Sequence, residues 1–276
     1  KISVDVEEIL DFLEEKEFLR REGDSVEATD LGKRVARLYI DPLSAVVLRE
    51  ALFSENRNIT SFSILQAVSL TPDVYPLFVR GKDSQYVTKF MYEHEDELLL
   101  PIPEDDADYE WFLNSVKTAM FYMEWIGENQ DKHEASEDRI ETLFNLGPGD
   151  VRNKVETAVW LLYAMRELSR LFNTGMTSDI DKVAIRVENG IREELLPIIK
   201  IRGIGRVRAR RLFDSGFNSM DRIRKATIPQ LASVKGIGRQ LAVQIKNLVE
   251  GGETVSEEEE SGLLDGPVQS NLMDFG

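Results

Sequence analysis

The sequence contains no cysteine and only two histidines among its 276 residues. The absence of cysteine excludes disulfide bonds and thiolate metal sites. His94 and His133 are isolated from each other in the sequence. They supply too few imidazoles for a histidine-based zinc site or a catalytic triad. We therefore expect neither a metal site nor catalytic residues in this chain.

Long apolar runs are also missing. No stretch approaches the roughly 20 apolar residues that a membrane-spanning helix requires, and the first residues do not resemble a signal peptide. We therefore expect a soluble, cytoplasmic protein without a membrane partner. The sequence begins at Lys1 and not at methionine, so we expect it to be part of a longer chain.

Positive charge is scarce overall but concentrated in one region. The chain has a formal net charge of −16. Residues 197–249, however, contain twelve basic and two acidic residues, a local net charge of +10. Such asymmetry is typical of a surface that contacts nucleic acid or an anionic membrane.

The first 42 residues predict a helix, a β-hairpin and a second helix. Apolar residues at helical spacing lead into two short extended runs around Gly23, which is a hairpin pattern. Thr29 or Asp30 can cap the helix that follows. We interpret residues 1–42 as a winged helix that is incomplete at its N-terminus.

Residues 43–196 predict a helical bundle, because prolines and a GPGD turn separate segments of helical spacing and strand patterns are few. One helix carries a regular apolar stripe, which we interpret as core packing. Its members are Tyr109, Phe112, Val116, Met120 and Met123.

The tetrapeptide GIGR occurs at 203–206 and again 33 residues later at 236–239. Each copy separates two helical stretches. Glycine permits the tight turn, and the following helix begins with unpaired N–H groups and its positive dipole end, which together bind anions. The repeat resembles the tandem helix-hairpin-helix module, which holds phosphates without reading base sequence. We place this domain at residues 197–249.

The predicted DNA contacts of this module are the turn glycines and the flanking arginines. They are Gly203, Gly205, Arg206, Arg208, Arg210, Arg211, Gly236, Gly238 and Arg239. On a helix, Arg206 and Arg210 share one face, while Arg208 and Arg211 lie on another. The predicted shared core consists of Ile204, Val207, Leu212, Ile237, Leu241 and Ile245.

The segment GPGDVRNKVETAVWLLYAMRELSRLF predicts a long helix after residue 147. Its predicted buried stripe consists of Val151, Val155, Ala158, Leu162 and Met165. Trp160 falls on the opposite side of the helical wheel. There its ring would either stack on nucleobases or meet a second apolar layer.

The residues from 250 to 276 include eight acidic residues and no basic residue, a composition that predicts disorder. The sequence QSNLMDFG at the end places Gln269, Leu272 and Phe275 at spacings of three. This pattern resembles the motif that docks on sliding clamps (PCNA), although Gly276 stands where a second aromatic residue is expected.

Three segments together resemble a known family. EATDLGKRVARLYIDP, GPGDVRNKVETAVWLLYAM and IRGIGRVRARRLF match, in order and spacing, the C-terminal part of archaeal Ski2-like superfamily-2 DNA helicases of the Hjm type. The resemblance spans residues 4–249. It implies a mainly α fold, in which a winged helix, a helical ratchet domain and a helix-hairpin-helix domain follow two RecA-like motor domains. It also implies an enzyme of DNA repair and recombination that unwinds branched DNA, such as stalled forks, with 3′ to 5′ polarity, ATP hydrolysis and Mg²⁺.

The resemblance assigns roles to individual residues. Trp160 would stack on the translocating strand. The family's second contact, an arginine two turns earlier, corresponds here to Asn153, whose basic neighbours Arg152 and Lys154 are further candidates. The arginines of RVRAR would grip the exiting strand.

The motor itself is missing from this sequence, which has no GxxxxGK[ST] phosphate loop and no acidic metal-binding box. ATP and Mg²⁺ are therefore expected to bind motor domains outside this stretch. Two alternatives remain open: a stand-alone helix-hairpin-helix adaptor that recruits the sliding clamp, and a relative of the RNA helicases within the Ski2-like group.

Overall fold

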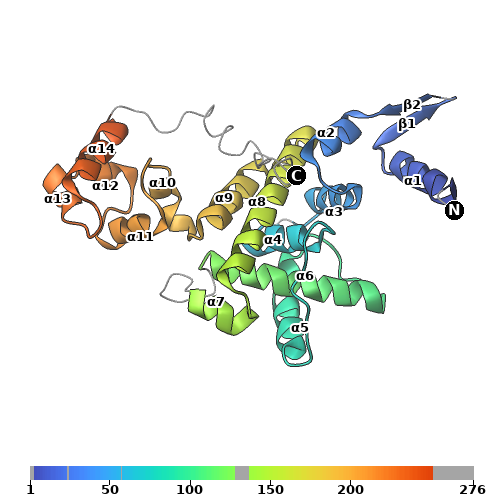
Figure 1. Ribbon diagram of the computed structural model, residues 1–276, viewed down its shortest axis with the longest axis horizontal. Helices are drawn as coiled ribbons and strands as arrows, with labels where there is room; N and C mark the ends of the chain where they lie inside the picture. The colour runs from blue at the N-terminus through green and yellow to red at the C-terminus, as the bar shows by residue number, and fades with distance from the viewer. Residues whose placement is uncertain (1–2, 24, 57, 128–136, 251–276) are drawn as a thin grey trace, which may run out of the picture. The chain divides into compact units, whose positions relative to one another are not determined.

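The computed structural model describes residues 3–23, 25–56, 58–127 and 137–250. In these ranges the fold is mainly helical, as predicted, and one two-stranded sheet contains both strands (Figure 1). No helix in the described ranges is long and apolar enough to span a membrane.

The predicted disorder and the predicted clamp-binding motif of the tail lie outside the described residues. The motif consists of Gln269, Leu272 and Phe275. Both stay predictions.

The chain divides into two compact units. The first consists of Lys1–Tyr122 and Gly149–Asp181, and the second of Met123–Pro148 and Lys182–Gly276. The predicted domain ranges 1–42, 43–196, 197–249 and 250–276 are not tested by this division and stay predictions.

The first unit begins with the predicted order of helix, hairpin and helix. Its elements are α1 (Ser3–Glu15), β1 (Leu19–Glu22), β2 (Ser25–Ala28) and α2 (Asp30–Leu38) (Figure 1). The strands are antiparallel, with Leu19 opposite Ala28. Gly23 lies in the turn with φ +60°, in the left-handed region that glycine adopts readily.

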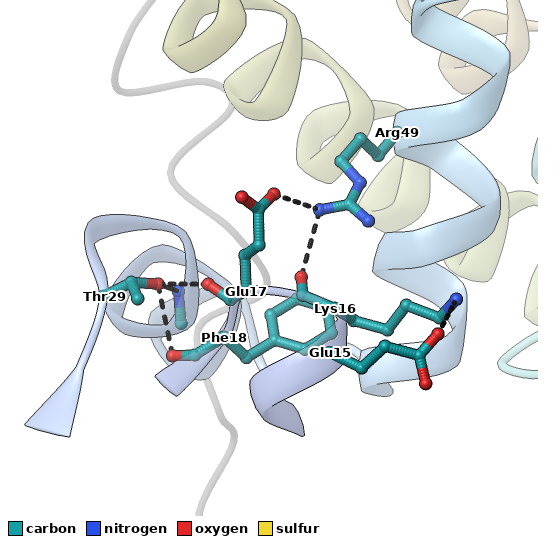
Figure 2. Close-up of polar contacts among 7 residues, drawn as sticks. Glu15, Lys16, Glu17, Phe18, Thr29 and Arg49 are labelled. Carbon is teal, nitrogen blue, oxygen red and sulfur yellow. Dashed lines mark hydrogen bonds and ion pairs between the residues drawn. The ribbon is translucent and has the colours of Figure 1, made fainter. Parts of the chain in front are cut away.

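Thr29 joins the hairpin to α2, and Figure 2 shows its contacts. Its hydroxyl oxygen accepts a hydrogen bond from the Gly32 N–H at 3.0 Å and lies 2.6 Å from the Glu17 carbonyl oxygen, to which it donates. Thr29 is therefore the N-cap of α2. A Cβ atom on Gly32 would lie 1.9 Å from the Phe18 carbonyl oxygen, so only glycine allows α2 to approach the chain so closely.

Arg49 of α3 (Pro42–Leu52) anchors the same region. Its Nη1 donates to the Lys16 carbonyl oxygen at 3.0 Å and lies 3.4 Å from a carboxylate oxygen of Glu17 (Figure 2). Because Arg49 binds the chain between α1 and β1, it ties the N-terminal elements to the helices that follow.

Helix α4 is a buried helix of the first unit and contacts α3, α5 and α6. All residues of α4 from Phe62 to Ser69 are buried. The predicted stripe of α6 is buried from Phe112 to Met123, and Tyr109 is partly exposed. The bounds are α4 (Ser61–Leu70), α5 (Ser84–Glu93), a 3-10 turn η1 (Glu95–Glu97), α6 (Asp106–Trp125) and α8 (Pro148–Phe172).

The second unit consists mainly of short helices, and one of them (Thr177–Asn189) begins in the first unit. Its elements are α7 (Glu137–Phe144), α9 (Thr177–Asn189), η2 (Glu193–Leu195), α10 (Leu196–Ile199), α11 (Arg206–Asp214), α12 (Met220–Lys225), α13 (Ile228–Ala232) and α14 (Arg239–Glu250). Helices α12 and α13 both contact α14, and Figure 1 shows the three together.

The 33-residue repeat is visible in the core of the second unit. Four pairs of equivalent positions are all buried: Ile201 and Val234, Ile204 and Ile237, Ala209 and Ala242, Leu212 and Ile245. The two halves therefore share one small hydrophobic core, as the sequence predicted.

The prediction for Val207 was wrong, because its side chain is 46% exposed. The buried residues of α11 are Ala209 and Leu212. Val207 precedes them by two and five positions, which places it on the other side of a helix with 3.6 residues per turn.

Candidate nucleic-acid interface

The first glycine of each GIG turn has a backbone conformation that other residues rarely adopt. Gly203 has φ +85° and Gly236 has φ +88°. After these turns, α11 begins at Arg206 and α14 at Arg239. The predicted arrangement of a glycine turn followed by a helix N-terminus is therefore present in both copies.

The second glycine of each turn has no such requirement. Gly205, the N-cap of α11, has φ −89°, and no side chain caps the helix there. A Cβ atom on Gly205 or Gly238 would meet no other atom within 4 Å. The fold thus tolerates a side chain at both positions. Glycine has no side chain to cap a helix, so it leaves both helix ends open to close approach by an anion.

We predict that substitution of the first glycine affects stability, whereas substitution of the second glycines affects DNA binding. Gly203→Ala should lower the free energy of unfolding by about 1–2 kcal/mol, because alanine is strained at positive φ. The double variant Gly205→Ala with Gly238→Ala should remain folded but bind single-stranded DNA more weakly, because the methyl groups obstruct the helix ends. Denaturant unfolding and DNA titration separate the two effects. Wild-type affinity in the double variant would contradict a role of these helix ends in binding phosphate.

Arg206 and Arg210 point into the second unit. The guanidinium carbon of Arg206 lies 5.1 Å from the ring centroid of Trp125, a cation–π distance. Arg210 Nη2 lies 3.0 Å from a carboxylate oxygen of Glu194. Both predicted DNA contacts therefore also hold α11 to its neighbours.

Arg208 and Arg211 connect the two glycine turns. Arg208 donates from Nη1 to the Gly203 carbonyl oxygen at 2.9 Å and from Nε to the Gly236 carbonyl oxygen at 3.1 Å. Arg211 donates to the Lys235 carbonyl oxygen at 3.1 Å. The division of the four arginines between two helix faces matches the helical wheel. Their role in gripping DNA stays a prediction.

Two exposed basic residues were absent from the predicted site. Arg202 and Lys235 occupy equivalent positions, each directly before the first glycine of its turn. Across the described stretch 137–250, neither these two side chains nor the exposed Arg239 has a hydrogen bond or ion pair. Aligning the two copies of the repeat would have identified both residues from the sequence. The N-terminus of α11 and that of α14 thus each have exposed positive charge beside them.

Trp160 is fixed on α8, a 25-residue helix. Its indole Nε1 donates to the Leu38 carbonyl oxygen at 3.0 Å, and its side chain is partly exposed. The predicted buried stripe is confirmed at Val151, Ala158, Leu162 and Met165, whereas Val155 is partly exposed. Trp160 therefore contacts a neighbouring element through one edge and keeps part of its surface accessible.

The three residues predicted around the second contact differ in their surroundings. Arg152 is exposed and pairs with Glu156 at 2.7 Å. Asn153 is also exposed. Lys154 is partly buried and donates from Nζ to the Tyr75 carbonyl oxygen at 2.7 Å, and burial lowers its pKa. Asn153 and Trp160 are seven positions apart and so share one face of α8.

No cluster of three or more potential metal-ligating side chains was found among the residues that the structure describes.

Two family models match adjacent parts of the chain. A model described as "Archaeal helicase, domain 4" matches residues 62–190. A model described as "SAM-like Helix-hairpin-helix tandem" matches residues 194–247, which include both glycine turns.

Curated proteins named ATP-dependent DNA helicase Hel308 are similar to the chain. The Methanocella arvoryzae protein is 40% identical over 278 residues, covering 98% of this chain and 36% of the relative. The Pyrococcus horikoshii protein is 34% identical over 243 residues, covering 87% and 33%. The Thermococcus kodakarensis protein is 35% identical over 272 residues, covering 97% and 23%. The chain thus spans about a quarter to a third of the length of these relatives.

Proposed function

The chain belongs to the archaeal Ski2-like DNA helicases and corresponds to their C-terminal part, and from this premise we propose that it is the DNA-handling segment of an ATP-dependent helicase. It binds single-stranded DNA without sequence preference while motor domains elsewhere in the enzyme hydrolyse ATP. The relatives are each named as an ATP-dependent DNA helicase, which supports this assignment over a stand-alone adaptor.

The observation that carries the proposal is the pair of glycine turns, each followed by a helix N-terminus. Each turn presents a helix N-terminus whose backbone N–H groups attract phosphate oxygens. Arg202 and Lys235 add positive charge at the two turns. These groups contact the DNA backbone and not the base edges, so they hold any sequence alike. A helicase needs this property because successive sequences pass through it.

Trp160 supplies a contact of another kind. An aromatic face stacks on any base, and the hydrogen bond to Leu38 holds the indole in place. We propose that motor strokes move the strand past this ring and that stacking resists backward slipping between strokes. Trp160 would then prevent backward movement of the strand, and the helix-hairpin-helix module would guide the strand or slow its passage.

The finer features of the activity are proposals taken from the family resemblance. They comprise 3′ to 5′ polarity, action on branched or stalled-fork DNA in repair and recombination, and use of ATP with Mg²⁺ by the motor domains. They also comprise a winged-helix role for residues 1–42. Docking of the tail on a sliding clamp through Gln269, Leu272 and Phe275 is a further proposal.

The salt dependence of binding tests the phosphate contacts. Replacing Arg202 and Lys235 together by glutamine should make the plot of log affinity against log salt concentration less steep, by about 0.7 for each lost phosphate contact with single-stranded DNA. Lys89→Gln on α5 is a matched control, because Lys89 is 70% exposed and lies far from the glycine turns in the sequence. Fluorescence anisotropy titrations at salt concentrations between about 50 and 200 mM measure this slope for the double variant and for the control. An unchanged slope in the double variant would refute the proposed phosphate contacts. Competition with an RNA strand of matched sequence would show whether the chain prefers DNA or RNA.

A further inference from the structure

A pocket with a volume of about 220 Å³ lies beside the first turns of α8. It is lined by Val74, Tyr75, Tyr122, Asp150, Asn153, Lys154 and Thr157. Asn153, Lys154 and Thr157 follow Asp150 by three, four and seven positions, the spacing of one helix face. The pocket is smaller than the roughly 300–1,000 Å³ of sites that enclose a drug-sized ligand or cofactor, so its size suits a single ring system.

Tyr75 provides an accessible aromatic ring at this pocket. Its side chain is 76% exposed, although large apolar side chains usually find a packing partner. The ring of Phe78 packs edge-on against it, with the centroids 5.6 Å apart. Lys154 Nζ lies over the same ring, 6.0 Å from its centroid. Phe78 and Lys154 therefore both contact the Tyr75 ring, and most of its surface stays exposed.

The backbone around Tyr75 is anchored to two helices. Lys154 of α8 donates to the Tyr75 carbonyl oxygen at 2.7 Å. Thr118 of α6 accepts from the Leu77 N–H at 2.8 Å, and Asn114 accepts from the Val79 N–H at 2.6 Å. Such anchoring lowers the entropic cost of presenting the ring to a ligand.

The charges at the pocket oppose each other. Asp150 and Lys154 both line the pocket. Burial lowers the pKa of Lys154, and the Asp150 carboxylate raises it by a smaller amount. A phosphate would meet the Asp150 carboxylate, so the pocket does not favour an anion. The Asn153 amide offers both a donor and an acceptor. A neutral, planar, hydrogen-bonding ring matches this combination.

We propose that this pocket binds one base of single-stranded DNA and that Tyr75 is a second stacking residue beside Trp160. This inference rests on the proposed function, because it assumes that the strand passes along α8. Asn153, at the pocket, precedes Trp160 by seven residues, about 10 Å along a helix that rises 1.5 Å per residue. The two aromatic rings would therefore contact different nucleotides of the same strand, and slipping backward would require both stacks to break.

Binding of single-stranded DNA by the 276-residue chain tests the proposal. Tyr75→Ala should weaken binding about 10-fold, within the range measured for loss of a base-stacking aromatic residue. Tyr75→Phe, which keeps a ring, should bind like the wild type. Tyr86→Ala is the matched control, because Tyr86 is 64% exposed on α5 and does not line the pocket. Unfolding curves for each variant check that the fold is retained.

A strand that carries abasic sites distinguishes a base contact from a backbone contact. Tyr75→Ala should have little effect on this strand, because the stacking partner is gone. An equal loss on both strands would overturn the nucleobase assignment.

Trp160→Ala separates this inference from the proposed function. If Trp160→Ala weakens binding and Tyr75→Ala does not, the pocket proposal fails and the proposed function stands. If neither variant changes the affinity, the pocket proposal and the stacking role of Trp160 both fail, and the proposed function then depends on the glycine turns alone.

Discussion

Replacing Trp160 by alanine should weaken the binding of single-stranded DNA by about 10- to 100-fold, since stacking of one base on an aromatic side chain contributes about 1–3 kcal/mol. The effect should be similar for strands of different sequence, because every base has a face on which an aromatic ring can stack. In the intact helicase, the same change should reduce unwinding more than ATP hydrolysis. Stacking on Trp160 limits backward slipping of the strand and takes no part in the chemical step. Anisotropy titrations measure the first effect, and paired unwinding and ATPase assays measure the second.

Two further variants, Trp160→Phe and Trp111→Ala, serve as controls for Trp160→Ala. Trp160→Phe keeps a stacking ring but loses the N–H donor to Leu38, and it should retain most of the affinity. Trp111→Ala removes a comparable tryptophan, whose Nε1 donates to the Leu70 carbonyl oxygen at 3.0 Å. It should leave DNA binding unchanged. If both alanine variants reduce the affinity equally, the loss reflects general destabilisation and the stacking role is wrong.

Leu212→Ala should unfold the helix-hairpin-helix module or bring it close to unfolding. Leu212 is fully buried in the core that the two repeats share. Replacing a buried leucine by alanine costs about 2–5 kcal/mol, and a module this small has little stability to lose. Thermal unfolding should show an earlier transition, and limited proteolysis should cut within residues 197–249. DNA affinity at low salt should fall with the loss of the folded turns.

Val207→Ala is the matched control for Leu212. It removes methyl groups from the same helix at a position that is 46% exposed, so the change in unfolding free energy should stay within about 0.5 kcal/mol. Equal destabilisation by the two variants would show that the described core is wrong. DNA binding that survives unfolding of the module would show that the glycine turns do not carry the phosphate contacts.

The sequence by itself determined the features that depend on local geometry. Helical spacing predicted the buried stripe of α8 and left Trp160 outside it. The GIGR repeat predicted two turns followed by helix N-termini, because left-handed φ values at Gly203 and Gly236 are a local requirement of such turns. The hairpin at Gly23 was predicted from its local pattern in the same way. The sequence offered Thr29 or Asp30 as the cap of the next helix, and the structure places the N-cap at Thr29.

Only the tertiary structure decided which groups meet across distant parts of the chain. The wheel separated Arg208 from Arg206, but it did not reveal that Arg208 binds the carbonyl oxygens of both glycine turns. Tyr75 was not predicted as a site residue because its contact with Lys154 joins positions 79 residues apart, and no local pattern records such a pair. Val207 was misassigned because an apolar residue on a short helix can lie on either face, and only the packing of the second repeat fixes which face is buried.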